Sequence, residues 1–403
     1  NMKRTVVALL CAVFMTGSVI SCGEAKKQVS SEVKTQETGQ GEEIQESSED
    51  EQTESDEEKT ENEKTEEEVP SPSEGQSENM TEDLTMTALR ENGGTIDYTS
   101  LEELEPEPGI RIAVVTKTTK TGFWNTIKQG MDAAVKDLNE KMGYKGDDKI
   151  RLSFEGPSDE TDVEGQINTI DAVLAENPAV LCLSAIDMAS CQAQLEYAEE
   201  NGIPVIVLDS GVATGTVNAV CVSDNYKAGA EAARKLAQAI EEKGKIAVMT
   251  HVESSENSQD REKGFTDEIA NYPDIEIVNI SHENEDSSVE EMTESVLTLF
   301  PDVKGYYCTN ETVGASVLDA VKASGKQLAV VGFDAGKRQK EAIQSGEEVG
   351  VIAQNPYGMG YATVVAAVRA ALELPNDEYI DPGYQWIDQT TVEDEKYVNY
   401  LYE

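Results

Sequence analysis

The sequence is poor in the residues that catalysis and metal binding use most. Its 403 residues include two histidines and six cysteines, and no two cysteines have the CxxC spacing. Neither His251 nor His282 stands in a motif of metal ligands or next to a nucleophile, so we expect surface or capping roles for both. These absences argue against an enzyme that uses a nucleophile or a bound metal.

Motifs that hold a nucleotide are also incomplete. The stretch GMGYAT at 358–363 has two glycines of a dinucleotide loop but Thr363 in place of the third. The SGK at 324–326 lacks the glycine five positions before Gly325 that a phosphate-binding loop requires. We therefore expect no cofactor.

Basic residues are scarce, with 32 Lys and Arg against 79 Asp and Glu and a formal net charge of −47. Such a chain repels a nucleic-acid backbone, so we expect no nucleic-acid partner. Between Glu42 and Glu68 there are 15 acidic residues and two lysines. A run of this kind repels itself and has little to bury, which predicts disorder rather than an acidic helix face.

Long apolar runs are missing except at the N-terminus. There Lys3 and Arg4 precede TVVALLCAVFMTGSVIS and then Cys22, which is typical of a signal segment and short for a membrane span. The residues VISC at 19–22 resemble the lipobox of bacterial lipoprotein signal peptides. The resemblance implies a signal peptide at 1–21 and a diacylglycerol on the Cys22 sulfur; a plain secreted protein cut elsewhere is the alternative.

Residues 22–107 are then interpreted as a disordered acidic tether, which would span on the order of 50 Å. The protein is expected outside the cytoplasm, anchored by lipid to the bacterial cell membrane. Cys11 leaves with the signal, and buried free thiols are favoured over a disulfide such as Cys182–Cys191 for the other cysteines, namely Cys182, Cys191, Cys221 and Cys308.

From Gly109 onward, short Val/Ile-rich segments alternate with amphipathic ones, as in doubly wound α/β folds with parallel sheets. Helices are predicted at 162–175, 226–241 and 311–324. Ten strands in about 295 residues favour two sheets over one. The predicted strands are 109–116, 149–154, 179–184, 203–209, 219–223, 245–250, 275–280, 305–310, 328–334 and 349–355.

Polar residues stand where five of these strands end. In parallel sheets, ligands sit at the carboxyl ends of the strands. Each residue alone could be a helix N-cap, but five together favour a polar cleft. They are Ser184, Asp209, Asn310, Asp334 and Gln354.

The helix predicted after the first strand carries two adjacent aromatic residues, Phe123 and Trp124, in a chain that is only 5% aromatic. Neighbours on a helix point about 100° apart, so one buried stripe does not easily hide both rings. We expect at least Trp124 to face a ligand; two core aromatics are the alternative. The buried stripe itself consists of Ile127, Met131, Ala134 and Leu138.

The stretch SSENSQDREKGF at 254–265 follows a strand and opens a helix. Arg261 offers five donors in a rigid fork, suited to adjacent hydroxyls or a carboxylate, and Asn257 lies one turn earlier on the same face. A structural salt bridge is the alternative role for Arg261.

Seven segments in order, together with the fold they predict, resemble the type I periplasmic sugar-binding proteins of the ribose-binding group from Gly109 to the C-terminus. They are VVTKTTKTGFWNTIKQG, IPVIVLDS, VSDNYKAG, NSQDREKGF, CTNE, VVGFDAG and VIAQNPYGMG. The resemblance implies two lobes joined by three crossing strands, closing on a monosaccharide that an ABC importer takes up, and a monomer. The implied lobes are 108–223 plus 355–386 and 224–354 plus 387–403.

Carried over by motif, Phe123 and Trp124 match the aromatic pair against the sugar ring. The polar contacts implied by the resemblance are Asp209, Arg261, Asn310, Asp334 and Gln354. Ser184 stands where ribose binders carry Asn, and Ser210 where they carry Arg. Lys120 lies near an expected Asn, and 282–288 lacks an expected aromatic. These departures separate the chain from ribose binders but keep a pocket suited to a sugar or related polyol.

A sensory receptor that presents a sugar, a nucleoside or a furanone signal to a membrane kinase or chemoreceptor would have the same binding domain. A ligand-gated transcription regulator would need a basic DNA-binding segment before residue 109, where the signal and the acidic tether stand instead.

Overall fold

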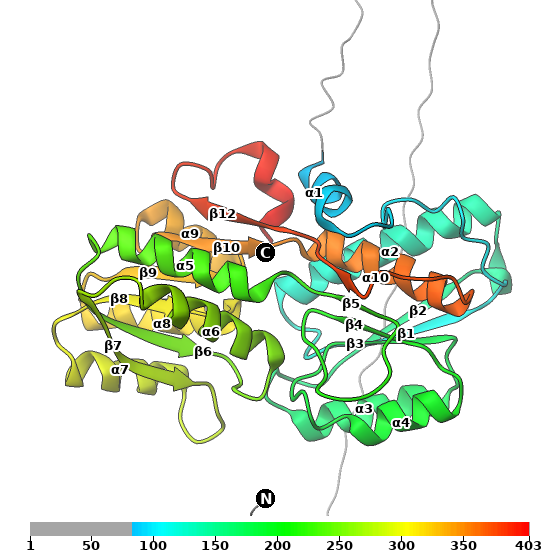
Figure 1. The fold of residues 1–403 in the computed structure, drawn as a ribbon, viewed down its shortest axis with the longest axis horizontal. Coiled ribbons are helices and arrows are strands. Elements are labelled where there is room, and N and C mark those ends of the chain that lie inside the picture. Colours follow the sequence, from blue (N-terminus) through cyan, green and yellow to red (C-terminus); the bar gives the residue numbers. More distant parts are fainter. Residues whose placement is uncertain (1–82, 403) are drawn as a thin grey trace, which may run out of the picture. The chain divides into compact units, whose positions relative to one another are not determined.

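Two six-stranded sheets organise residues 83–402, the part of the chain that the computed structural model describes (Figure 1). The signal segment, Cys22 and the tether up to residue 82 lie outside the described residues. Each sheet has helices on both faces, so each forms an α/β lobe.

The first lobe is built on the strand order β11-β5-β4-β3-β1-β2, in which every pair is parallel. Ile112 and Val114 of β1 pack under α2 and α10, while Ala113 and Val115 face α3 and α4. This alternation is the period-2 pattern of a strand buried on both faces. The strands are β1 (Arg111–Val115), β2 (Arg151–Glu155), β3 (Val180–Leu183), β4 (Val205–Leu208), β5 (Ala219–Cys221) and β11 (Tyr379–Ile380). The helices are α1 (Leu84–Asn92), α2 (Gly122–Met142), η1 (Gly146–Asp148), α3 (Val163–Ala175), α4 (Gln192–Glu200) and α10 (Pro356–Ala371).

The second lobe repeats this plan with the order β12-β10-β9-β8-β6-β7, in which only β12 is antiparallel. Helices α5 and α6 cover one face, and α7 and α8 cover the other. The strands are β6 (Gly244–Thr250), β7 (Ile275–His282), β8 (Val303–Cys308), β9 (Ala329–Phe333), β10 (Gly350–Gln354) and β12 (Tyr384–Asp388). The helices are α5 (Asn225–Ala239), α6 (Glu256–Ile269), α7 (Val289–Leu299), α8 (Glu311–Ser324), α9 (Lys337–Ser345) and η2 (Glu395–Tyr400).

The chain passes between the sheets three times: after β5, after β10 and between β11 and β12. The predicted fold class, two doubly wound lobes joined by a three-strand hinge, is therefore confirmed. We expected the third crossing after residue 386. It comes before Tyr384 instead, because Tyr384 already pairs with Gln354 in the second sheet.

All ten predicted strands form, with ends shifted by a few residues. Two of them, β2 and β7, are half-exposed rather than buried on both faces, because they lie at sheet edges. The sequence reading missed β11, which has two residues, and the antiparallel β12.

The predicted tether is wrong at its C-terminal end. Residues 84–107 carry helix α1 and contribute Leu89, Tyr98 and Leu104 to the core of the first lobe, each at most 1% exposed. These apolar residues are spaced among acidic ones, and burial against α10 outweighs the local charge.

Paired helices in both lobes approach so closely that only glycine fits between them. A Cβ on Gly264 of α6 would lie 2.0 Å from the Tyr226 carbonyl oxygen of α5, and one on Gly130 of α2 would lie 2.0 Å from the Tyr357 carbonyl oxygen of α10. The close contact fixes α6, which carries Asn257 and Arg261, against the rest of its lobe.

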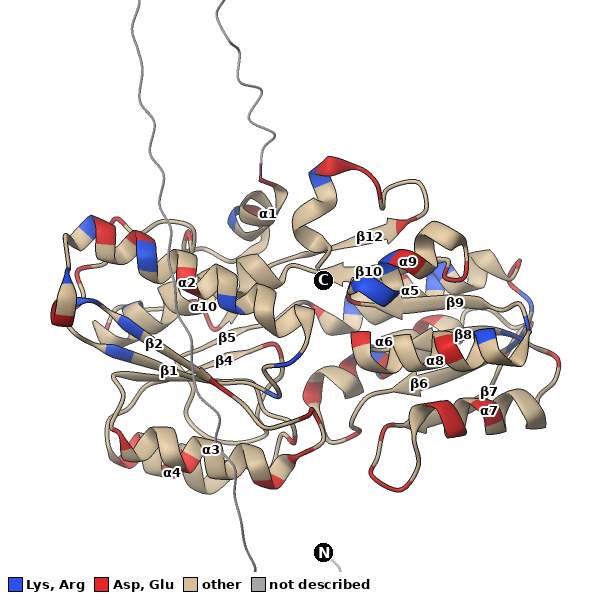
Figure 2. Cartoon of the chain, turned by 180° about the vertical axis from the view of Figure 1, so that it is seen from behind, with Lys and Arg blue, Asp and Glu red and all other residues tan. Residues whose placement is uncertain are grey.

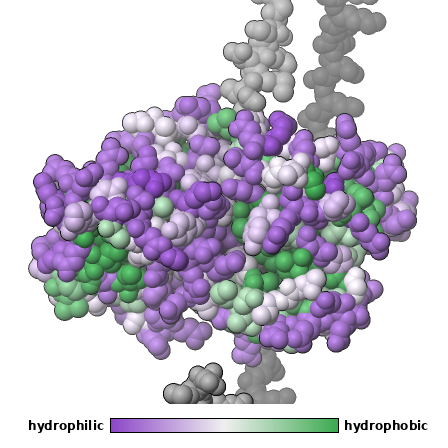
Figure 3. Space-filling view, viewed as in Figure 1, coloured by the Kyte–Doolittle hydropathy of each residue, from purple (hydrophilic) through white to green (hydrophobic). Residues whose placement is uncertain are grey.

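Acidic residues lie on the outer helices of both lobes, including α7 (Figure 2), and the face drawn in Figure 3 is mostly hydrophilic. All four cysteines of residues 83–402 are buried and free, as predicted. No helix within this range is long and apolar enough to cross a membrane.

Candidate functional site

The polar residues predicted at strand ends all lie at the carboxyl edges of the two sheets. Ser184 follows β3 and Asp209 follows β4 in the first lobe. Asn310 stands two residues after β8, Asp334 follows β9, and Gln354 ends β10 in the second lobe. These five side chains and Ser210 are buried.

Two aspartates occupy equivalent places in the lobes: Asp209 directly follows β4 and Asp334 directly follows β9, each the fourth strand of its sheet in chain order. Asp209 has φ 60° and Asp334 has φ 69°, in the left-handed region that residues other than glycine rarely adopt. The Asp209 carboxylate accepts a hydrogen bond from Ser184 Oγ at 3.0 Å. Strain of this kind is typical of binding sites, where the surrounding structure holds a side chain in one direction.

The Asp334 carboxylate is held by two donors. Gln354 Nε2 donates to Oδ1 at 2.7 Å, and the Glu311 backbone N–H donates to Oδ2 at 3.1 Å. Burial raises the pKa of Asp334, and the nearby Arg261 guanidinium and these donors oppose that rise.

Arg261 of α6 is 1% exposed and stacks on the Phe333 ring, with its guanidinium carbon 3.7 Å from the ring centroid. Its Nε donates to Asn225 Oδ1 at 2.9 Å and its Nη1 to the Thr309 carbonyl oxygen at 2.7 Å. Its Nη2 is buried and has no hydrogen-bond partner within residues 83–402. The guanidinium is therefore fixed in direction and keeps one free donor group. Among the residues that the structure describes, Arg261 forms no salt bridge.

Asn257 of α6 joins the two lobes. Its Nδ2 lies 3.3 Å from the Asp209 carbonyl oxygen and 3.4 Å from Asp209 Oδ2. Its Oδ1 accepts from Lys117 Nζ at 3.2 Å. Ser210 makes a second link, with its Oγ 3.1 Å from Ser255 Oγ.

Lys117 is a site residue that sequence reasoning missed. It follows β1, is 4% exposed, donates to Ser255 Oγ at 2.6 Å and lies 3.8 Å from Asp209 Oδ2. Burial lowers its pKa, while Asp209 and Glu160 favour the charged form. Lys120, which drew attention in the sequence, is exposed. The signal for Lys117 was its place directly after the first strand of the sheet, where a ligand-facing residue is expected.

Glu160, also missed, connects the aromatic pair to the second lobe. Its Oε1 accepts from the Trp124 indole Nε1 at 2.8 Å, and its Oε2 accepts from Asn310 Nδ2 at 3.1 Å. Burial raises the pKa of Glu160, and Lys117 and the Trp124 N–H partly reverse the shift. Glu160 stands in a loop between β2 and α3, where no strand-end pattern marks it.

Phe123 and Trp124 both lie in the core cluster of the first lobe, 6% and 1% exposed, with their rings edge to face at 5.2 Å. The stripe of Ile127, Met131, Ala134 and Leu138 is fully buried, as predicted. The helix buries both rings because they stand at its N-terminal end, where loops and the other lobe add cover beyond the stripe.

His251 is not a surface residue, so that expectation was wrong. It is 4% exposed, its Nδ1 lies 2.8 Å from Thr309 Oγ1, and its Nε2 lies 2.8 Å from Asn257 Oδ1. Burial, together with Lys117 and Arg261, lowers its pKa well below the usual value, so the ring is neutral. An amide oxygen only accepts, which places the single ring proton on Nε2.

The ring expected near 282–288 is absent from the sequence there, and two other aromatics lie near the site. Phe333 supports Arg261, and Tyr402 lies 6.2 Å from Phe123.

His282 is half-buried and pairs with Glu262 at 2.8 Å. Among residues 83–402 no group of three or more His, Cys, Asp or Glu is arranged to hold a metal ion.

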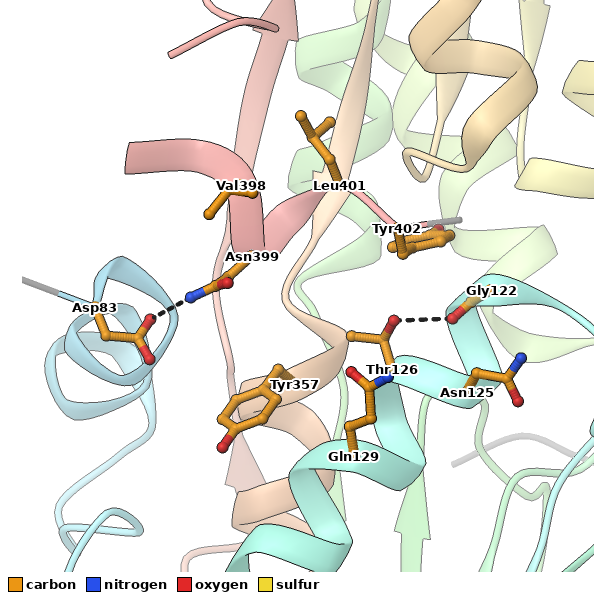
Figure 4. A pocket seen from close by; sticks show the side chains of 10 residues that line it. All are labelled: Asp83, Gly122, Asn125, Thr126, Gln129, Tyr357, Val398, Asn399, Leu401 and Tyr402. Carbon is orange, nitrogen blue, oxygen red and sulfur yellow. Dashed lines mark hydrogen bonds between the residues drawn. The ribbon is translucent and has the colours of Figure 1, made fainter. Parts of the chain in front are cut away.

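A separate pocket of about 510 Å³ lies beside the hinge (Figure 4). It is lined by α2 from Gly122 to Gln129, by Tyr357 of α10, and by the C-terminal residues from Val398 to Tyr402. The pocket adjoins the site described above at Gly122, at the N-terminus of α2, and at Tyr402.

Comparison with known proteins agrees with this fold. Residues 112–373 match the periplasmic binding protein domain family. The ribose import binding protein of Haemophilus influenzae is 26% identical over 256 residues, which are 64% of this chain and 84% of that protein. A xylitol-binding protein of Mycolicibacterium smegmatis is 24% identical over 273 residues, 67% of this chain and 74% of that protein.

A solved structure is also similar. The solute-binding protein of an ABC transporter from Agrobacterium vitis, determined with bound D-fucose, superposes with a TM-score of 0.67 at 26% identity. The match covers 72% of this chain and 100% of that one. The family match spans more than half of the chain, and the chain therefore belongs to the periplasmic binding protein domain family, in its ribose-binding type.

Proposed function

We propose that this protein captures a monosaccharide or a related polyol between its two lobes and delivers it to an ABC importer. The observation that carries the proposal is the buried guanidinium of Arg261. Its Nη2 has no partner in the described part of the chain, although carboxylates, amides and hydroxyls of both lobes gather in the same site. An unpaired buried donor is costly, and a ligand oxygen would satisfy it.

A polyol suits the chemistry of these groups. Asp209 and Asp334 accept hydrogen bonds, Arg261 and Lys117 donate them, and Asn257 and Gln354 do both, as the hydroxyls on the rim of a sugar require. The relatives support this class of ligand, since their names record ribose, xylitol and D-allose.

The anchor forms a second part of the proposal. Cleavage before Cys22 and a lipid on its sulfur would hold the protein outside the cytoplasm, with the tether carrying the lobes to the permease. Radiolabelled lipid incorporation into the wild-type chain, absent from Cys22→Ser, is the expected result, and incorporation into that variant would refute the assignment.

A thermal-shift screen of the protein against pentoses, hexoses, inositols and nucleosides tests the binding proposal. We expect at least one sugar or polyol to raise the melting temperature, because a ligand that binds only the folded state stabilises it. Arg261→Lys should abolish the shift, since an ammonium cannot reproduce the fork, whereas Arg234→Lys on the exposed side of α5 should keep it. A shift by nucleosides alone would refute a sugar ligand.

Uptake separates import from sensing. A strain that lacks the protein should lose uptake of the labelled ligand, and unchanged uptake would favour the sensory receptor.

A further inference from the structure

Tyr402 is buried where the two lobes meet, with 7% of its surface exposed. The segment before it belongs to the second lobe, where Tyr400 is 0% exposed in a cluster with Ile343, Val351 and Ile387. Residues 400–402 therefore run from the core of the second lobe to that of the first.

On the second-lobe side, Tyr402 is fixed by two hydrogen bonds to one residue. Its backbone N–H donates to the Ala335 carbonyl oxygen at 3.1 Å, and its hydroxyl accepts from the Ala335 N–H at 3.1 Å. Ala335 directly follows Asp334, whose backbone is in the left-handed region. Tyr402 thus fixes the backbone next to Asp334 through these two hydrogen bonds.

On the first-lobe side, the Tyr402 ring packs on the aromatic pair. Its centroid lies 6.2 Å from that of Phe123, and the ring belongs to the same core cluster as Phe123 and Trp124. In Figure 4 it lies next to the first turn of α2 at Gly122. Burial and the carboxylates of Asp334 and Glu311 raise the pKa of the phenol well above its usual value, so the hydroxyl keeps its proton.

We propose that Tyr402 is a clasp: a positioning residue that joins Asp334 of the second lobe to Phe123 of the first and holds the lobes closed on the ligand. The existence of a ligand rests on the function proposed above, whereas the contact that Tyr402 makes between the lobes does not. Separation of the lobes must break either the ring contact with Phe123 or both hydrogen bonds to Ala335. The clasp therefore slows opening.

The first experiment needs no ligand. Hydrogen exchange of the full chain is compared for wild type, Tyr402→Ala and Tyr402→Phe. Tyr402→Ala should speed exchange at Phe123 and Ala335, and Tyr402→Phe, which keeps the ring, should speed it at Ala335 alone. Tyr379→Ala, at a tyrosine 63% exposed, is the matched control and should leave both unchanged. Wild-type exchange at Phe123 in Tyr402→Ala would overturn the clasp.

The second experiment uses D-ribose, D-allose and xylitol as probes in stopped-flow binding. For whichever binds, Tyr402→Ala should speed dissociation about tenfold with little change in association, since loss of a closing contact acts on release. Tyr402→Phe should recover most of the residence time. A lower melting temperature with unchanged dissociation would assign Tyr402 a structural role only and overturn the proposal. If no probe binds the wild type, the proposed function loses support, and the exchange experiment still decides the clasp.

Discussion

Trp124 and Glu160 are joined by a hydrogen bond of 2.8 Å from the indole nitrogen to a carboxylate oxygen. The second oxygen of that carboxylate accepts from Asn310 of the other lobe at 3.1 Å. One acidic side chain thus ties the aromatic side of the site to its polar side, and this tie forms only when the lobes meet.

Glu160→Gln should weaken ligand binding by about tenfold, or roughly 1.4 kcal/mol. Both neighbours donate, and a carboxamide offers only one oxygen, so either Trp124 or Asn310 would face an N–H group. Calorimetry with the ligand found in the screen measures the effect. Glu155→Gln, at the exposed end of β2, is the matched control. Equal affinities for Glu160→Gln and wild type would show that the tie does not contribute to closure.

The sequence was sufficient for the strands and for the residues that end them, because apolar runs and their terminal polar groups are local features. The places of Asp209, Asp334 and Gln354 at the ends of strands were therefore predicted, and the place of Arg261 and Asn257 on one helix followed from their spacing. Both the family resemblance and the physics of parallel sheets pointed to the same edge.

The missed residues depend on contacts between residues that are far apart in the sequence. Glu160 and Tyr402 act through partners 150 and 67 residues away, Asn310 and Ala335, and no periodicity records such a pairing. Lys117 was overlooked, and His251 was expected in a surface or capping role, for another reason: a buried lysine or neutral histidine is tolerated only inside a hydrogen-bond network that the fold creates.

The folded state should be more stable at mildly acidic pH than at alkaline pH. Glu311 accepts a hydrogen bond from the Phe123 N–H of the other lobe, and burial, with Asp334 and Glu160 nearby, raises its pKa to about 8. Glu283, buried and near Glu160 and Asp159, has its pKa raised to about 7. An acid with a raised pKa contributes stability that is complete below its unfolded pKa, near 4.5, and is lost as pH rises through the folded value.

The melting temperature should accordingly fall between pH 6 and pH 8.5, and Glu311→Gln should flatten that fall, because its amide does not ionise. Differential scanning calorimetry of both proteins across this range measures the difference. Glu341→Gln, at an exposed position on α9, controls for the change in overall charge. Parallel pH profiles for wild type and Glu311→Gln would contradict the assignment.

Because the backbone of Asp334 is in the strained left-handed region, a glycine variant should be more stable there than an alanine variant, which is the reverse of the order inside a helix. Both Asp334→Gly and Asp334→Ala remove the carboxylate and should abolish binding. Asp334→Ala should be less stable by about 1 kcal/mol, because a Cβ disfavours the left-handed backbone at φ 69°. At Asp319, inside helix α8, the order should reverse, since alanine favours a helix over glycine by about 1 kcal/mol. Urea unfolding measures the free energy of unfolding of the four variants. If the glycine and alanine variants had the same order of stability at both positions, the backbone at Asp334 would not be strained.

Gly264 sets how closely α6 approaches α5, and with it the contact between Arg261 and Asn225. The hydrogen bond from Arg261 Nε to Asn225 Oδ1 is 2.9 Å long and spans these two helices. A Cβ at position 264 would meet the Tyr226 carbonyl oxygen at 2.0 Å, a backbone atom that cannot rotate away. The helices must then separate or bend.

Gly264→Ala should lower the free energy of unfolding by about 1–3 kcal/mol, the usual cost of overpacking, and weaken ligand binding as Arg261 is displaced. Gly314→Ala in α8 is the matched control: its nearest neighbour is the side-chain amide nitrogen of Gln339 at 3.1 Å, which has to give way by only a few tenths of an ångström. Chemical unfolding and calorimetry should separate the two. If both glycine variants proved equally stable and bound equally well, the glycine contact would not be what positions Arg261.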